Sequence, residues 1–286
     1  MIKTPPGWGA AILTQAYQSV TTVRSGWTAS GTEHASAPPT VQRIGFADLR
    51  WALGRGLEDF GASRTDVVFL CVIYPVLGLL LARVAFGYEL LPLIFPMASG
   101  FALVGPLAAV GLNEMSRRRE QGLSAGWADA FGVFRSPSIH AIVLLGVVLI
   151  LLFLFWLLLS NAIYNLTLGP RPPTSLSSFA HDVIATRAGW TMAFVGVGTG
   201  FVFAVVALTI SVVSFPLLLD QNVPLETAVR TSARVVARNP VTMAVWGLIV
   251  AAGLVAGSIP LLLGLIFVMP VLGHATWHLY RRVVAR

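Results

Sequence analysis

Residues 241–280 read VTMAVWGLIVAAGLVAGSIPLLLGLIFVMPVLGHATWHLY, and this stretch contains no Asp, Glu, Lys or Arg. A straight helix of that length would be about 60 Å long at about 1.5 Å per residue, whereas the hydrocarbon core of a membrane is about 30 Å thick. The segment is therefore expected to fold back on itself. The predicted turn is Gly257-Ser258-Ile259-Pro260, because Gly relieves the backbone at a helix C-terminus and Pro suits the first turn of the next helix. This stretch alone predicts two transmembrane helices.

The composition excludes a water-soluble protein. Of the 286 residues, 56% are hydrophobic and only 11% are charged, and the mean hydropathy is +0.79. Soluble domains carry about 25% charged residues. Four more uncharged stretches precede the decisive one: Val67–Ala82, Leu90–Leu112, Ile139–Leu159 and Thr191–Leu219. We therefore predict an all-α, polytopic membrane protein with six transmembrane helices arranged as three hairpins.

The positive charges predict the orientation of the chain. A net charge of +7 could indicate a nucleic-acid partner, but the basic residues lie in short loops beside apolar stretches, where Lys and Arg mark the cytoplasmic side. With six spans and a cytoplasmic N-terminus, only Arg83, Arg171 and Arg187 fall on the outer side. We expect both termini in the cytoplasm, membrane lipids as partners, and no nucleic acid.

The ends of the chain and its one cysteine add little chemistry. Residues 1–42 are polar and rich in small side chains, which predicts a disordered cytoplasmic tail ahead of a membrane domain at residues 43–286. No cleavable signal peptide is expected, since this region has no sustained apolar core. Cys71 lies inside an apolar stretch, so the sequence offers no disulfide framework and no cysteine-based metal motif.

A threefold repeat is predicted, with units at about residues 46–114, 123–220 and 225–282. Each unit begins with a segment of helical period, expected to lie in the cytoplasmic membrane interface as an amphipathic helix. The apolar stripes are Phe46, Leu49, Leu53, Leu57 and Phe60 in the first, Leu123, Trp127, Phe131 and Phe134 in the second, and Leu225, Ala228, Ser232 and Val235 in the third. All three end in a similar triplet, where the chain should turn into the bilayer: Arg64-Thr65-Asp66, Arg135-Ser136-Pro137 and Arg238-Asn239-Pro240.

Aromatic and basic side chains near the ends of the predicted spans are expected at the headgroups, where rings with one polar end are favoured. These are Trp51, Trp127, Trp277, Tyr280, Arg281 and Arg282.

The best candidate site is a cluster of polar residues near the cytoplasmic ends of the predicted spans: Glu114, His140, Asp220, His274 and His278. His274 and His278 share one helical face, and His140 opens a span at a similar depth, so the three imidazoles are candidate ligands of a haem or metal. The competing interpretation is that these histidines anchor helices at the interface by hydrogen bonds. No cofactor is predicted outright.

The two acids of the cluster also have two interpretations. Asp220 and Glu114 are candidate proton or cation sites, or they pair with arginines of the neighbouring loops. A transporter with a charged site in mid-membrane is disfavoured, because no acid lies in the middle of a span. Catalysis has no support, since the sequence contains no Ser-His-Asp elbow, HExxH, P-loop or GxGxxG motif. His181 and Asp182 are interpreted as surface of the outer loop at residues 160–189.

Several stretches carry a resemblance to a known family: residues 96–112, Ser116-Arg117-Arg118 with Glu120, residues 214–220, residues 239–243 and residues 273–282. Together they resemble a proteobacterial family of uncharacterised integral membrane proteins, the domain of unknown function 2189, over about residue 43 to the end. The resemblance implies the bacterial inner membrane and no established activity. Members are sometimes labelled as similar to cytochrome c oxidase subunit I, but this chain has too few helices and histidines for an oxidase core.

Three functions follow, in order of preference. The first is a non-enzymatic inner-membrane protein that organises lipid or supports the assembly of a membrane complex, including a respiratory one. The second is a transporter or channel for a small or lipid-like solute. The third is a haem or metal-binding respiratory accessory protein, which would use His140, His274 and His278.

Overall fold

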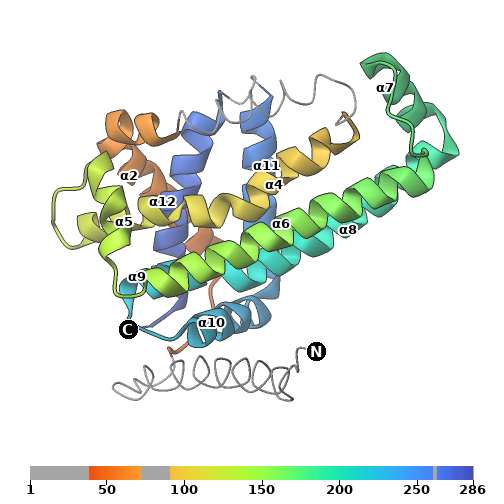
Figure 1. Ribbon diagram of the computed structural model, residues 1–286. Coiled ribbons are helices and arrows are strands. Elements are labelled where there is room, and N and C mark those ends of the chain that lie inside the picture. The colour runs from red at the N-terminus through yellow and green to blue at the C-terminus, as the bar shows by residue number, and fades with distance from the viewer. Residues whose placement is uncertain (1–38, 72–90, 260–262, 286) are drawn as a thin grey trace, which may run out of the picture. The chain divides into compact units, whose positions relative to one another are not determined.

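A computed structural model describes residues 39–71, 91–259 and 263–285, with the side chains of residues 63–71, Phe101 and Trp127 left out. The described chain is helical, as the sequence predicts (Figure 1). Its helices are α2 (Phe46–Cys71), η1 (Leu91–Leu93), α4 (Ile94–Ala108), α5 (Val110–Glu120), η2 (Trp127–Arg135), α6 (Ile139–Thr167), α7 (Leu176–Ala185), α8 (Arg187–Ser211), α9 (Ser214–Asp220), α10 (Leu225–Arg238), α11 (Pro240–Ser258) and α12 (Leu265–Val283).

Within these residues, four helical segments are long and apolar enough to cross a membrane: Leu91–Glu120, Ile139–Thr167, Arg187–Asp220 and Pro240–Ser258. They coincide with four of the six predicted spans. The predicted first span, 67–82, lies mostly outside the described residues. The predicted sixth corresponds to α12, which falls outside the four because its second half carries His274, His278, Arg281 and Arg282.

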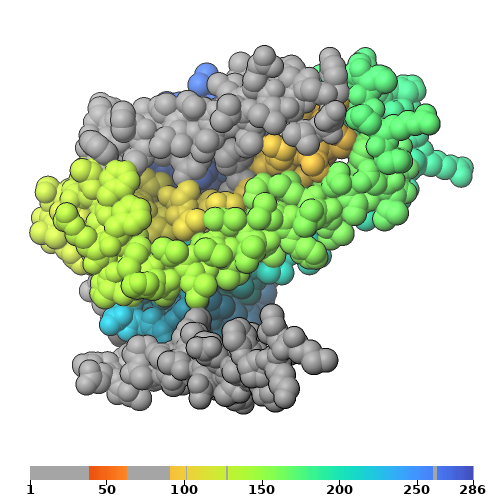
Figure 2. All heavy atoms as spheres, in the orientation of Figure 1, coloured from red at the N-terminus to blue at the C-terminus, as the bar shows by residue number. Residues whose placement is uncertain are grey.

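Helices α6 and α8 form a long antiparallel pair joined by α7 (Figure 1). Trp156 of α6 packs against Phe203 of α8, with 5.5 Å between ring centroids. Helix α6 crosses the view in Figure 2, and its exposed side chains include the apolar residues Leu151, Phe155 and Leu158. Such a surface favours a hydrocarbon environment, since a soluble protein rarely leaves so large an apolar area in water. The predicted outer loop at residues 160–189 contains α7.

Prolines mark two breaks in the long segments. Pro216 has no N–H to donate to the carbonyl of Val212, and α8 ends at Ser211 while α9 begins at Ser214. Pro106 stands inside α4 two residues before its end, and α5 continues after Ala109. The predicted turn of the decisive stretch also falls at a helix end, because α11 ends at Ser258.

Helix α2 differs from the predicted interfacial helix in three ways. It runs unbroken to Cys71, so the turn predicted at Arg64-Thr65-Asp66 is wrong. It packs antiparallel along α12 instead of standing alone, with Phe60 near Phe267 and Trp51 near His278.

Its buried face also differs from the predicted apolar stripe. That face is Leu49, Ala52, Gly56 and Asp59, whereas Phe46 and Leu57 of the stripe are exposed. Its small residues, Ala52 and Gly56, explain why this face of α2 is the one that packs against α12. A Cβ at Gly56 would come within 2.7 Å of the backbone nitrogen of Ala275, so only glycine lets the two backbones approach so closely.

Helix α10 matches its predicted stripe, because Ala228, Ser232 and Val235 are buried and Leu225 packs against the core. It ends at Arg238, and α11 begins at Pro240, as the Arg238-Asn239-Pro240 triplet predicts. The Asn239 side chain does not cap α11. Its Oδ1 accepts from the backbone N–H of Ile44 at 2.9 Å, and its Nδ2 donates to the carbonyl of Gln42 at 3.1 Å.

The second predicted interfacial segment is a short 3-10 helix, η2, which ends at Arg135 just before α6, as its triplet predicts. Ala130 and Val133 are its buried residues, while Leu123, Phe131 and Phe134 of the predicted stripe are exposed. The rings of Phe131 and Phe134 stack with their centroids 6.2 Å apart. This exposed aromatic surface beside the start of a spanning helix suits the headgroup region.

Candidate functional site

Helix α12 places two histidines on one face, as the spacing of four residues predicts. His274 and His278 are both buried, with 1% and 5% of their surface exposed. They face α2 on one side and α5 on the other, because α12 packs against both helices. The burial of two imidazoles requires polar partners, and these come from the neighbouring helices.

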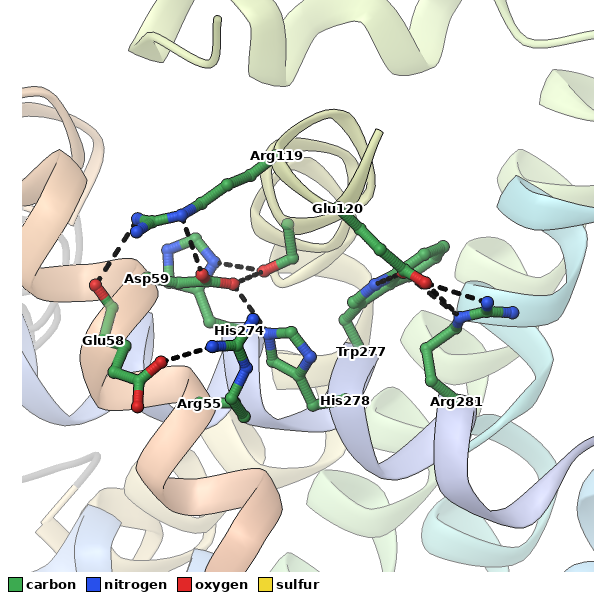
Figure 3. A network of polar contacts seen from close by, with 10 residues as sticks. Arg55, Glu58, Asp59, Arg119, Glu120, His274, Trp277, His278 and Arg281 are labelled. Atoms are coloured by element: carbon green, nitrogen blue, oxygen red, sulfur yellow. Dashed lines mark hydrogen bonds and ion pairs between the residues drawn. The ribbon is translucent and has the colours of Figure 1, made fainter. Parts of the chain in front are cut away.

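Asp59 of α2 is the centre of this arrangement (Figure 3). Its Oδ2 accepts a hydrogen bond from the Ser116 hydroxyl at 2.6 Å and lies 2.8 Å from Nε2 of His278. Its Oδ1 lies 3.3 Å from Nε of Arg119. Ser116 Oγ is in turn 2.8 Å from Nδ1 of His274. We call Asp59, Ser116, Arg119, His274 and His278 the polar junction.

The hydrogen positions in the polar junction follow from its geometry. An ionised carboxylate only accepts, so Nε2 of His278 donates to Asp59. The Ser116 hydrogen is committed to Asp59, so His274 Nδ1 donates to Ser116. Burial by itself raises the pKa of the Asp59 carboxyl, but the hydrogen bonds from His278 and Ser116 outweigh it and hold the pKa below its usual value. Asp59 is therefore charged and ties three helices together.

This arrangement is structural and differs from that of a hydrolase. A serine nucleophile donates its hydrogen to a histidine base and faces the substrate. Ser116 donates to a carboxylate instead and is 1% exposed.

A second group of polar contacts joins α5, α9 and α12. Glu120 accepts from the Trp277 indole N–H at 2.9 Å and from Arg281 Nη2 at 2.8 Å. The Tyr280 hydroxyl donates to Asp220 Oδ2 at 2.7 Å, and Arg281 Nη1 lies 3.4 Å from the same oxygen.

Trp277 and Tyr280 are consequently buried in the protein, at 0% and 1% exposed, where headgroup contact was expected. The reason is that their polar atoms find partners inside the bundle. Of the other residues predicted at the interface, Arg282 is half exposed and lies over the exposed ring of Trp51, 4.2 Å from its centroid. Arg281 is held by Glu120, and the side chain of Trp127 lies outside the described residues.

The predicted five-residue cluster divides into separate environments. His274 and His278 belong to the polar junction, and Asp220 belongs to the second group. Glu114 is buried and pairs within its own helix with Arg117, whose Nε and Nη2 lie 2.6 and 2.8 Å from its carboxylate oxygens. His140 lies on the exposed surface at the start of α6. Within the described ranges no group of three His, Cys, Asp or Glu side chains is placed to hold a metal ion.

Sequence reasoning missed Asp59, Ser116, Arg119 and Glu120. For Asp59 a signal existed: it follows Leu49, Ala52 and Gly56 at spacings of three and four, the register of one helical face. An acid in register with small residues is a candidate for a buried partner. The other three residues, Ser116, Arg119 and Glu120, lie in a polar segment. Such a segment is equally typical of a helix end that faces a loop, so it gives no signal of a buried network.

Beside these polar groups lies a cavity of about 340 Å³, lined by residues of α4, α5, α8, α9, α11 and α12. Its walls are mostly apolar and include Phe201, Leu208, Trp246 and Met269. It opens at the protein surface between α8 and α11, where Phe201 and Leu248 are each 68% exposed. A cavity of this size and lining is typical of sites for small apolar ligands.

The model of the family DUF2189, described as a predicted integral membrane protein, matches residues 94–220. This confirms the family resemblance that the motifs predict, from α4 to α9, while the motifs at residues 239–243 and 273–282 lie beyond the match. The proteobacterial source and the oxidase-like label stay predictions of the sequence. No curated protein and no solved structure matches the chain.

Proposed function

We propose that this integral membrane protein is non-enzymatic and binds a lipid-like molecule in the bilayer, thereby organising lipid around itself. The observation that carries the proposal is the apolar cavity, which opens between α8 and α11 on surfaces that already favour hydrocarbon. A lipid chain can enter such an opening sideways without crossing water. The exposed aromatic surface of η2 adds a headgroup-level contact.

The polar junction supports a structural role in this proposal. Its side chains bond to one another from α2 through α5 to α12. Such a network fixes the relative positions of the helices that form the cavity walls, since α5 and α12 contribute to both. A rigid frame is what a preformed site requires.

The proposed topology is six spans with both termini in the cytoplasm of a bacterium, α12 being the sixth. The charge pattern supports this arrangement, because Arg281 and Arg282 then join the other cytoplasmic arginines. Reporter fusions test it: a green fluorescent protein after Arg286 should fluoresce. Activity of an alkaline phosphatase fused at the same place would rule out the six-span topology.

Lipid binding is tested on protein extracted in native nanodiscs. Mass spectrometry should find a neutral or single-chain lipid that stays bound after the bulk lipid is exchanged. In Gly247→Leu, which places a side chain toward Leu208 in the cavity wall, that lipid should be lost. Gly198→Leu is the matched control, because a Cβ at Gly198 meets nothing within 4 Å. Equal lipid content in all three proteins would contradict the proposal.

The same cavity supports transport of a lipid-like solute as a second candidate function, because an opening toward the bilayer is also an entry route. Proteoliposomes separate the two functions: a transporter moves a fluorescent lipid analogue between leaflets faster than empty liposomes do, whereas a lipid-organising protein leaves that rate unchanged.

An accessory role beside a respiratory or other membrane complex predicts co-purification of that complex. The haem or metal hypothesis is tested by a visible absorption spectrum with and without dithionite.

A further inference from the structure

The cavity has one polar end. Asn113, Ser211 and Thr276 are the hydroxyl and amide side chains among its lining residues. Asn113 lines the cavity from α5, and Thr276 is the lining residue of α12 that is nearest the C-terminus of that helix. The two helices run in the same direction, because Ser116 contacts His274 and Glu120 contacts Trp277.

Ser211 lies toward the same end of the cavity. It is at the end of α8, and the following helix α9 reaches Asp220, which bonds Tyr280 one turn beyond Thr276 on α12. The three polar side chains therefore gather at the end nearest the polar contacts of Asp220, and the opposite end is apolar.

This polar end presents hydrogen-bond acceptors, beside the N–H donors of the Asn113 amide. The Ser211 hydroxyl donates to the carbonyl of Ala207, and the Thr276 hydroxyl donates to that of Leu272. Each hydrogen is thus used within its own helix, and the lone pairs of the oxygen remain to accept. Asn113 is 1% exposed, and its Oδ1 has no hydrogen-bond partner among the described residues. A buried acceptor without a partner is unfavourable, and a ligand that donates a hydrogen bond would satisfy it.

The lining also selects against charge. Among the lining residues that the structure describes there is no Asp, Glu, Lys, Arg or His. A carboxylate or ammonium group would lose its hydration there without gaining an ion pair, which is strongly unfavourable.

We propose that the cavity binds an uncharged, single-chain amphiphile whose head group donates hydrogen bonds, of the class of a long-chain alcohol or a monoacylglycerol. This inference rests on the proposed lipid-binding function and specifies its ligand. The head lies at Asn113 and the chain extends toward the opening beside Phe201 and Leu248. In the proposed topology the head group is at the level of the cytoplasmic leaflet.

The test uses the full chain in lipid nanodiscs and a photoreactive 1-decanol that carries a diazirine in its chain. Mass spectrometry maps the cross-links, and three competitors are compared at equal mole fraction in the bilayer: 1-decanol, decyl methyl ether and decanoate at pH 8. The ether has a similar chain but no hydrogen to donate. One hydrogen bond corresponds to a preference of roughly fivefold for decanol over the ether, and decanoate should compete least.

Two variants and a control make the result specific. Asn113→Leu removes the acceptor and should reduce the preference for decanol to about one while cross-linking continues. Asn161→Leu, an exposed position on α6, should keep the wild-type preference. Near-ultraviolet circular dichroism confirms that each variant is folded.

The outcomes separate this inference from the proposed function. Cross-links in the lining residues of α8 and α11 with equal competition by all three compounds would overturn the inference and leave lipid binding intact. A preference for decanol that persists in Asn113→Leu would also overturn it. Cross-links that map only outside the cavity would overturn both.

Discussion

Replacement of Asp59 by Ala should destabilise the protein more than any exposed substitution on α2. The carboxylate is 3% exposed and accepts two hydrogen bonds, from Ser116 at 2.6 Å and from His278 at 2.8 Å. Hydrogen bonds to a charged group contribute about 1.5–3 kcal/mol each. The Arg119 side chain is 41% exposed, so its contact with Asp59 is screened by solvent and adds about 0–1 kcal/mol.

The expected loss in the free energy of unfolding is about 3–5 kcal/mol, the range found when one partner of a buried ionic network is removed. The assay is equilibrium unfolding of the detergent-solubilised protein by titration with sodium dodecyl sulfate, followed by circular dichroism. Glu58→Ala is the matched control, because Glu58 is the neighbouring acid and its side chain pairs with Arg55 on the exposed surface of α2. The control should lie within about 0.5 kcal/mol of the wild type.

A loss for Asp59→Ala that equals the loss for Glu58→Ala would refute the reasoning, because it would mean that the carboxylate does not join α2 to α5 and α12. A double-mutant cycle of Asp59→Ala with Ser116→Ala sharpens the measurement. Residues in one network should show a coupling energy of about 0.5–3 kcal/mol. Additive losses would contradict the hydrogen bond between them.

Three further measurements test other parts of the packing. Gly56→Ala should lower the free energy of unfolding by about 1–3 kcal/mol, because the added Cβ would clash with the backbone of α12. In the control Gly54→Ala the added Cβ meets nothing within 4 Å, so this change should stabilise α2. Equal effects of the two changes would refute the close approach of α2 to α12. The stability that the Asp59 carboxylate contributes should be fully present above about pH 4, and it should be lost as the pH falls through the folded-state pKa of Asp59, which is lower than that of the unfolded chain. A pH profile of stability that is the same in Asp59→Asn and in the wild type would contradict this. Tyr280→Phe should cost about 1–2 kcal/mol of unfolding free energy by removing its hydrogen bond to Asp220. A neutral effect would contradict that hydrogen bond.

Much of the candidate site could not be predicted from the sequence, because its partners are far apart along the chain. Asp59 is 57 residues from Ser116 and 219 residues from His278. The histidine pair was found because its two members share one helix, so a period of four residues reveals it. The apolar cavity has no local signature, since its walls come from six helices that are far apart along the chain.

The sequence by itself determined the membrane class, four helical segments that can span a bilayer, and the helix ends at two of the three polar triplets, Arg135-Ser136-Pro137 and Arg238-Asn239-Pro240. These properties are local: transfer to hydrocarbon adds up residue by residue, and a missing N–H acts on its own turn. Tertiary structure alone decided which face of α2 is buried, since Gly56 permits an approach that the larger side chains of its apolar stripe prevent. It also moved Trp277 and Tyr280 from the expected interface into the core, because Glu120 and Asp220 offer their polar atoms partners there.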